Sequence, residues 1–365
     1  MTGLPQTRAV IEEGIGQRLH LGAQLYVSRH GQTVADLAMG ESRPGQALDR
    51  DDLMLWLSSC KPVAAIAIGR LWERGKLTLD DTVARHIPEF AARGKERVSI
   101  RHLLTHTAGF RGAAGTWTTR SWEQIIAHIC GASLEAGWVP GKKAGYHVAS
   151  SWFILGELVR RIDGRPYDRY VREEVFLPLG MEDAWIGMPA ERVRAYGARL
   201  APMHEVEDGD FLDDLAGNRE GGLVMPRPGA NGRAPARQFA RIYESLLAGL
   251  RGERTGGVLG PQTVEALLAR HRVGLYDHTF KHMMDWSLGF IPNNGCYSDA
   301  VAYGYGPCAS LRAVGHSGAQ SSVAFADPEH GLAVAIAFNG MPSEGEHQQR
   351  MRQVLGALYA DLGLA

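Results

Sequence analysis

Residues 58–61 read Ser58-Ser59-Cys60-Lys61, and this S-x-x-K stretch decides how the chain is interpreted. An apolar run of strand type (LMLWL, residues 53–57) precedes it, and apolar and small residues typical of a buried helix (PVAAIAIGRL, residues 62–71) follow it. If Ser58 opens that helix, Lys61 lies one turn further on the same face. A lysine kept away from water loses its proton near neutral pH and can accept one from a neighbouring hydroxyl. The stretch therefore predicts a nucleophilic Ser58 with Lys61 as its base, whereas the same tetrapeptide on an exposed helix would carry no chemistry.

The composition is that of an ordinary globular enzyme and excludes several other classes. The chain has 365 residues, 45% of them hydrophobic and 22% charged, with a net charge of −1. This length predicts two domains or one large one. No basic block indicates nucleic acid and no apolar run is long enough to span a membrane, so a small-molecule substrate is the expected partner.

The four cysteines, Cys60, Cys130, Cys296 and Cys308, include no C-x-x-C pair, so neither a metal nor another cofactor is expected. Residues 1–20 have the pattern of an amphipathic helix and lack the apolar core of a signal peptide. We therefore expect a cytoplasmic protein with four reduced thiols. Cys60 is not favoured as the nucleophile, because its local sequence offers no histidine partner.

Strand-like runs occur at both ends of the chain. Residues 24–29 and 33–40 flank a glycine-bearing turn and predict a β-hairpin. Near the other end, strands are predicted at 285–291, 314–318, 321–326 and 332–338, and a closing helix at 344–362. We expect the first hairpin to complete the C-terminal sheet.

The middle of the chain has mostly helical spacing. Helices are predicted at 122–130, 151–162, 167–176 and 236–250, and the glycine- and proline-rich connection 226–235 is long enough to shape a site. The expected fold is α/β of the α+β type, an antiparallel sheet flanked by helices. Residues 1–85 and 240–365 would form this α/β domain, and residues 86–239 an inserted, mostly helical domain. The active site is expected in the cleft between them.

Two further segments bear on Ser58. Tyr146 stands just ahead of a predicted helix, and beside a cationic lysine its phenolate form is favoured, so that it can act as a general base. Residues 315–319 (GHSGA) begin a predicted strand, where small residues let a ligand approach the backbone and a free N–H can stabilise an oxyanion. Taken singly, these segments are better explained as a core aromatic residue and a sheet edge.

Together the three segments resemble the motifs of the serine β-lactamase and penicillin-binding-protein superfamily, in particular its class C β-lactamase-like esterases and acyltransferases. Ser58 and Lys61 match the first motif, Tyr146 the second, and residues 316–318 (HSG) the third. Residues 75–81 (GKLTLDD) and 100–110 (IRHLLTHTAGF) also resemble segments of this family, and all occur in the expected order.

The resemblance implies a β-lactamase/transpeptidase-like fold and a serine hydrolase that works through an acyl-enzyme. Ser58 would attack the carbonyl, with Lys61 and Tyr146 sharing the base role. The resemblance places the oxyanion hole at the backbone N–H groups of Ser58 and Ala319. Substrate-binding positions would include Ser317 and Gly318, while His316 would tune Tyr146 and pass a proton to the leaving group.

Two departures from the family pattern bear on the substrate. Val148 stands where the second motif usually has Asn, and His316 stands where the third often has Lys. The first change removes a group that helps to bind a substrate amide, and the second removes a fixed cation that would pair with a substrate carboxylate. We therefore expect a small ester or thioester as the substrate, in preference to a β-lactam or a D,D-peptide.

Other interpretations remain open. The same acyl-enzyme could pass its acyl group to an amine or alcohol, which would make the protein an acyltransferase. An α/β-hydrolase with Ser317 as nucleophile is disfavoured, because a strand rather than a helix is predicted after it. A catalytically inactive binding protein would have no need of three intact motifs. Candidates for an aromatic acyl pocket are Trp117, Trp152, Trp286 and Tyr303.

Overall fold

A seven-stranded antiparallel sheet forms the centre of the computed structural model, which describes residues 3–115, 118–213, 215–253, 258–298 and 303–365. The strand order is β11-β12-β13-β14-β1-β2-β3. The bounds are β1 (Gly22–Arg29), β2 (Gln32–Arg43), β3 (Gln46–Ala47), β11 (Ile291–Pro292), β12 (Val314–Gly318), β13 (Ser322–Asp327) and β14 (Leu332–Phe338). Because β14 pairs with β1 from Ala23↔Phe338 to Arg29↔Leu332, the two ends of the chain share one sheet, as the sequence predicted.

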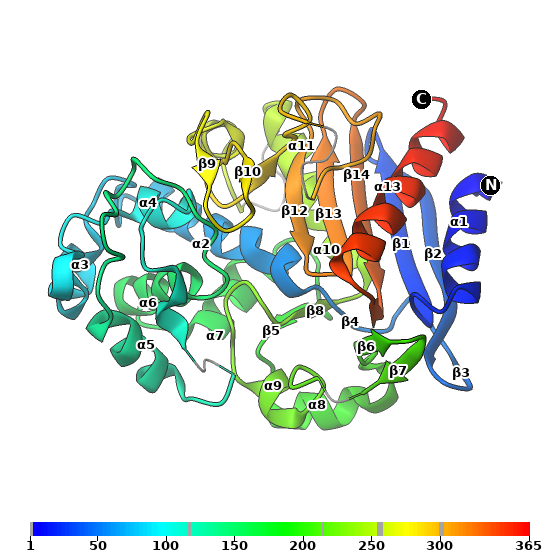
Figure 1. Cartoon of the computed structure of the whole chain (residues 1–365), viewed down its shortest axis with the longest axis horizontal. Coiled ribbons are helices and arrows are strands. Elements are labelled where there is room, and N and C mark those ends of the chain that lie inside the picture. Colours follow the sequence, from blue (N-terminus) through cyan, green and yellow to red (C-terminus); the bar gives the residue numbers. More distant parts are fainter. Residues whose placement is uncertain (1–2, 116–117, 214, 254–257, 299–302) are drawn as a thin grey trace.

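The two faces of this sheet carry side chains of different size, because alternate residues of a strand point to opposite faces. Large residues of β13 and β14, such as Phe325 and Ile336, pack with the terminal helices α1 (Pro5–Gly16) and α13 (Glu344–Asp361). The opposite face presents alanines, among them Ala324 and Ala335. Small side chains let α10 (Ala236–Phe239) and α11 (Arg241–Leu250) lie close against the strands, so the sheet is covered on both faces (Figure 1).

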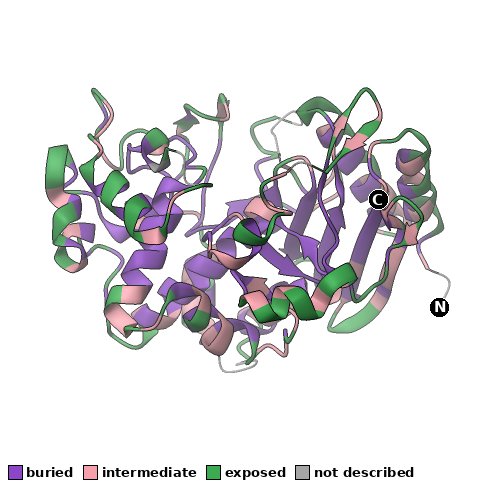
Figure 2. Ribbon diagram, turned by 90° about the horizontal axis from the view of Figure 1, so that it is seen from below, coloured by how far each residue is buried: buried purple, intermediate pink, exposed green. Residues whose placement is uncertain are grey.

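The remaining helices are α2 (Lys61–Glu73), α3 (Val83–His86), α4 (Ile100–Leu104), α5 (Trp122–Gly131), α6 (Ser150–Asp163), α7 (Tyr167–Val171), α8 (Ala190–Tyr196), α9 (Glu220–Val224) and α12 (Pro261–Leu268). Most of them, among them α3 to α7, lie on the side of the sheet away from the chain termini, whereas α8 and α9 lie along the lower edge in Figure 1. Helix α2 is buried over most of its length and contacts α6, α7 and α12 (Figure 2). A helix that is apolar on all sides belongs in a protein interior, which explains the unbroken apolar run after Lys61.

Three small sheets accompany the main sheet among the described residues. One small sheet has the order β4-β8-β5, with bounds Met54–Leu55, Gly232–Ala234 and Trp185–Ile186. A second has the order β15-β6-β7, with bounds Gly340–Met341, His204–Glu207 and Asp210–Leu212. A third pairs β9 (Tyr276–Asp277) with β10 (His282–Met283). The division of the chain into residues 1–85 plus 240–365 and residues 86–239 stays a prediction.

Several predicted elements differ in detail from the structure. The strand expected at 285–291 is wrong except at its end, because Gly289 adopts φ +80° and donates its N–H to Leu104 O, which turns the chain away from the sheet. Of residues 53–57, only Met54–Leu55 pair as strand β4. The helix predicted at 167–176 is α7 followed by a π-turn (Arg172–Phe176), and the one at 236–250 divides into α10 and α11.

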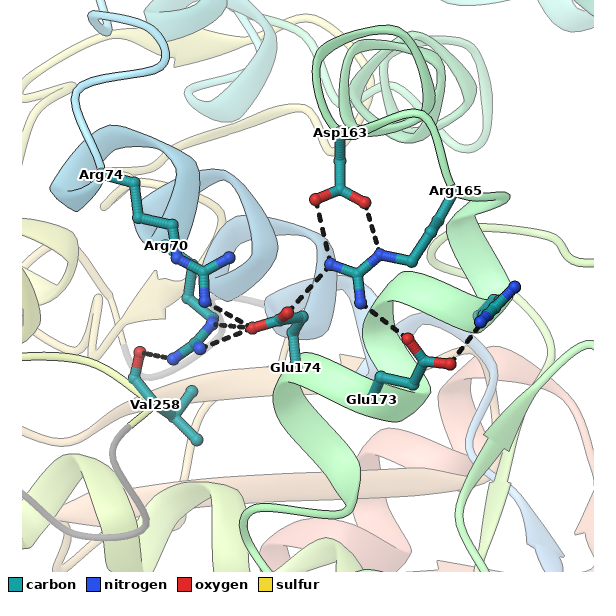
Figure 3. Close-up of polar contacts among 8 residues, drawn as sticks. Arg70, Arg74, Asp163, Arg165, Glu173, Glu174 and Val258 are labelled. Carbon is teal, nitrogen blue, oxygen red and sulfur yellow. Dashed lines mark hydrogen bonds and ion pairs between the residues drawn. The ribbon is translucent and has the colours of Figure 1, made fainter.

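An ion-pair network fixes the C-terminal end of α2 (Figure 3). Glu174 lies at its centre and accepts hydrogen bonds from Arg70 and Arg74, both at 2.6 Å, and from Arg165 at 2.9 Å. Burial acts to raise the pKa of the Glu174 carboxyl, but the three guanidinium groups together lower it to about 2. The network therefore ties α2, which begins at Lys61, to the segment that follows α6.

Candidate active site

Ser58 lies in a single 3-10 turn, Leu57–Cys60, held between the end of β4 and the main sheet. The Ser59 hydroxyl donates to His316 O at 3.2 Å and lies 3.0 Å from the Ser322 hydroxyl. Ser322 in turn donates to Trp56 O at 2.9 Å. These hydrogen bonds tie the turn to β12 and β13 on both sides of Ser58, so the backbone at Ser58 is fixed by the sheet.

Gly318 makes this contact possible. A Cβ atom at position 318 would lie 2.5 Å from Trp56 O and 2.4 Å from the Ser322 hydroxyl, which no real side chain tolerates. Leu57, directly before Ser58, has φ +44°, a conformation that costs a non-glycine residue about 1 kcal/mol or more and is common at functional sites. The sheet therefore approaches the turn at backbone distance, with Ala319 next along the chain. The oxyanion role of the Ser58 and Ala319 N–H groups stays a prediction.

Lys61 is the first residue of α2 and is fully buried. Its ammonium donates to the Ser58 hydroxyl at 2.8 Å and to Gly229 O at 2.8 Å. Desolvation lowers the pKa of Lys61 to about 7, because the charged form loses its hydration without gaining a carboxylate partner. The structure thus brings the predicted nucleophile and base into direct contact.

Gly229 comes from the connection 226–235, which the sequence analysis singled out. It adopts φ +85°, and a Cβ atom there would lie 2.7 Å from Lys61 Cγ and 3.1 Å from the Trp152 ring. Only glycine lets the chain place its carbonyl on the lysine at this distance.

Tyr146 lies on the other side of Lys61, whose ammonium is 5.2 Å from the centre of the phenol ring. The side chain is buried, and this burial raises the pKa of Tyr146 well above its ordinary value, although a hydrogen bond with Ser58 acts in the opposite direction. The phenol is therefore favoured over the phenolate, which is the opposite of what the sequence argument expected from a neighbouring cation. Between the two groups, Lys61 is the one that is deprotonated near neutral pH.

His316 projects from β12 and is also buried. Its Nδ1–H donates to Ser317 O at 2.8 Å, and its Nε2 has no hydrogen-bond partner among the described residues. Burial first, and the nearby Lys61 second, lower the pKa of His316 to about 3. The ring, 6.2 Å from that of Tyr146, is thus neutral at pH 7 and supplies no fixed positive charge to the third motif.

A buried aromatic cluster surrounds the lysine and the tyrosine. His106 packs at 4.6 Å, centre to centre, against both Tyr146 and Trp286. The Trp152 ring lies 5.4 Å from the Lys61 ammonium. These rings exclude water from Lys61, which is the physical cause of its low pKa.

The other proposed pocket residues have different positions. Tyr303 packs on Phe280, which in turn packs on Tyr146, so it belongs to the outer part of this cluster. Trp117 lies outside the described residues. Val148, at the position where the family pattern has Asn, is 53% exposed. Cys60 is buried, and burial raises the pKa of its thiol to about 11, so it stays protonated and unreactive at neutral pH.

Sequence reasoning missed several residues that build the site. Ser59 and Ser322 fix the turn that contains Ser58, and Asp277 accepts a hydrogen bond from the backbone N–H of Tyr146 at 3.1 Å. Asp277 carries no local signal, because it lies 131 residues from the group it binds and in no motif.

Within the described part of the chain, no helix is long and apolar enough to cross a membrane. Among the same residues, no group of three or more His, Cys, Asp or Glu side chains is arranged to hold a metal ion.

The chain belongs to the Beta-lactamase family, whose model matches residues 7–359. Among its relatives, Esterase/beta-lactamase LipL of Mycobacterium tuberculosis is 27% identical over 351 residues, covering 88% of this chain and 78% of LipL. Esterase EstB of Burkholderia gladioli is 29% identical over 322 residues, covering 78% of each chain. Among solved structures, a family VIII carboxylesterase superposes with a TM-score of 0.80 at 26% identity, covering 99% of this chain and 98% of the other.

Proposed function

We propose that the protein is a serine hydrolase that cleaves small esters or thioesters through an acyl-enzyme on Ser58. The observation that carries the proposal is the 2.8 Å contact between the Ser58 hydroxyl and the buried ammonium of Lys61, whose pKa is about 7. A base with a pKa near the working pH combines a useful deprotonated fraction with enough driving force for proton transfer. The names of the relatives LipL and EstB, both esterases, support the same class.

In this mechanism Lys61 accepts the Ser58 proton as the hydroxyl attacks the substrate carbonyl. The N–H groups of Ser58 and Ala319 bind the oxyanion, which develops where the sheet meets the nucleophile's turn. Tyr146, still a phenol, shares the base role by relaying the proton to the leaving alkoxide, and the free Nε2 of His316 accepts hydrogen bonds beside it. Water then attacks the acyl-enzyme by the same route in reverse.

The substrate preference follows from charge. His316 is neutral, so the site holds no cation at the third motif for a substrate carboxylate, and Val148 offers no amide-binding group. Both features favour a neutral ester over a β-lactam or a D,D-peptide. The four cysteines are all free thiols, which supports a reducing compartment, and a cytoplasmic location is part of the proposal.

The test is hydrolysis of p-nitrophenyl butyrate by the intact protein, with rapid-quench mass spectrometry to detect a butyryl adduct on Ser58. Turnover with an adduct that forms and decays at the steady-state rate supports the proposal. Turnover that survives in Ser58→Ala would refute it.

Acyl transfer is the alternative, because the same acyl-enzyme can react with an amine or alcohol. The two outcomes separate in a partitioning experiment at fixed ester and increasing acceptor. Free butyrate should track leaving-group release if the protein is a hydrolase. A fall in free acid at millimolar acceptor, with leaving-group release maintained, would replace hydrolase by acyltransferase, since only a bound acceptor can compete with water at about 55 M.

A further inference from the structure

The backbone of Tyr146 is held on both sides by one short segment, residues 277–279. The Tyr146 N–H donates to Asp277 Oδ1 at 3.1 Å, and the Thr279 hydroxyl donates to Tyr146 O at 3.1 Å. Two residues before Tyr146, the Ala144 carbonyl accepts a hydrogen bond from the His278 N–H at 2.9 Å. Tyr146 lies in the irregular segment ahead of α6, which begins at Ser150, so its position is set by this contact with a distant loop.

Asp277 organises that loop as well. The oxygen that binds Tyr146 also accepts the N–H groups of Thr279 at 2.9 Å and Phe280 at 3.0 Å. The Phe280 ring packs on the Tyr146 phenol, 4.7 Å centre to centre. One carboxylate oxygen thus fixes the tyrosine's backbone and the aromatic ring that covers its side chain.

The charge of Asp277 is met by Arg272, at 3.1 Å, and both side chains are at most 1% exposed. Arg272 is itself fixed, because it donates to Met284 O at 3.1 Å and Thr105 O at 3.2 Å and lies 5.0 Å from the Trp286 ring centre. A buried ion pair is seldom more stabilising than a well-packed apolar pair, so stability alone does not account for its presence beside the site.

We propose that Asp277 is a positioning residue that acts through Tyr146, aligning the phenol for proton transfer to the leaving group. The proposal rests on the proposed function, since it assigns Asp277 a part in the same reaction. Its role differs from that of Arg272, whose side chain pairs with the carboxylate and donates to Met284 O and Thr105 O rather than to Tyr146.

The test compares two double variants, because Asp277→Ala alone would leave Arg272 as an unpaired buried charge and could unfold the protein. Both doubles carry Arg272→Met, which removes that charge at similar volume. Asp277→Asn then keeps an oxygen that can accept the Tyr146 N–H, whereas Asp277→Ala removes it. Any effect of losing the ion pair is common to both variants. The difference between them therefore reports the loss of the side-chain oxygen that holds Tyr146, together with the bonds of that oxygen to Thr279 and Phe280.

We expect the Asp277→Ala double to show kcat about 10- to 100-fold below that of the Asp277→Asn double, with KM changed less than about threefold, as for partial loss of general acid–base catalysis. The deficit should be larger for ethyl butyrate than for p-nitrophenyl butyrate, because ethoxide needs a proton to leave and p-nitrophenolate does not. A merely structural role would lower both substrates equally. Circular dichroism and thermal unfolding of the two doubles verify equal folding.

Equal kcat values in two folded doubles, or a deficit that is the same for both esters, would overturn the assignment. That result is separable from failure of the proposed function. If the unmodified protein fails to hydrolyse either ester, the proposed function itself is wrong. If the unmodified protein turns over normally and the two double variants have equal kcat values, only the role of Asp277 is wrong.

Discussion

Replacing Lys61 by Met should inactivate the protein and at the same time stabilise it. Met has a similar length and no charge, so the side chain can stay in the same buried space. A shift of the Lys61 pKa from 10.5 to about 7 means that burying the charged form costs at most about 5 kcal/mol of folding free energy. The substitution removes this cost, but it also removes the hydrogen bonds to Ser58 and to Gly229 O, worth about 1 kcal/mol each, and leaves that carbonyl unpaired. We therefore expect a net gain of about 1 to 3 kcal/mol at pH 7.

The pH dependence provides a second check on the same reasoning. Between pH 7 and 10.5 the unfolded state binds more protons at Lys61 than the folded state does, so the wild type becomes more stable as the pH rises through this window. The free-energy cost of burying the charged Lys61 side chain is complete below pH 7 and disappears above pH 10.5. The gain in unfolding free energy of Lys61→Met over the wild type should consequently be greatest at or below pH 7. Above pH 7 this gain should decrease by up to about 1.4 kcal/mol per pH unit.

Urea unfolding at pH 7 and pH 9.5 measures both effects, with Lys76→Met as a matched control. Lys76 is exposed, so its substitution should change the free energy of unfolding by less than about 0.5 kcal/mol and leave turnover intact. Two results would contradict the low pKa of the buried Lys61 side chain. One is that Lys61→Met is less stable than the wild type at pH 7, and the other is that its gain in unfolding free energy does not decrease as the pH rises.

Three further outcomes follow from the site and its supports. Gly229→Ala should lower kcat more than about tenfold, because a Cβ atom at φ +85° would displace Lys61. Steady-state kinetics of the folded variant measures this effect, and an unchanged kcat would contradict the importance of the Gly229 backbone contact. Glu174→Gln should lose on the order of 2 to 3 kcal/mol of stability at pH 7 and little near pH 2. A carboxyl with a lowered pKa stabilises the fold above its ordinary pKa, and this stabilisation is lost as the pH falls towards about 2. Urea unfolding at both pH values measures the loss, and a loss that does not change with pH would contradict the prediction. Nitrocefin should be cleaved far more slowly than p-nitrophenyl butyrate, and comparable kcat/KM values would mean that Val148 and the neutral His316 do not set the substrate preference.

The contact between Ser58 and Lys61 could be predicted from the sequence because its signals are local. Ser58 and Lys61 are one helical turn apart between two apolar runs, and the antiparallel sheet follows from alternating strands joined by tight turns. The apolar run after Lys61 also predicted that the lysine side chain would be buried, and this burial is the cause of its low pKa.

What could not be predicted depends on tertiary contacts. The protonation of Tyr146 depends on burial by His106 and Trp286, which outweighs the effect of a nearby lysine. The strand expected at 285–291 failed because Gly289 takes a positive φ to contact α4, a preference that no periodicity encodes. Asp277 was invisible for the same reason, since only the fold brings it to Tyr146.

The claim that Ser58 is the nucleophile has a direct measurement. Reaction of the intact protein with a fluorophosphonate, followed by intact mass spectrometry and peptide mapping, should give one adduct, on Ser58, and no adduct in Ser58→Ala. The rate of labelling should rise with pH through about 7 as Lys61 loses its proton. An adduct on Ser317 or Cys60, or labelling that persists in Ser58→Ala, would contradict the account.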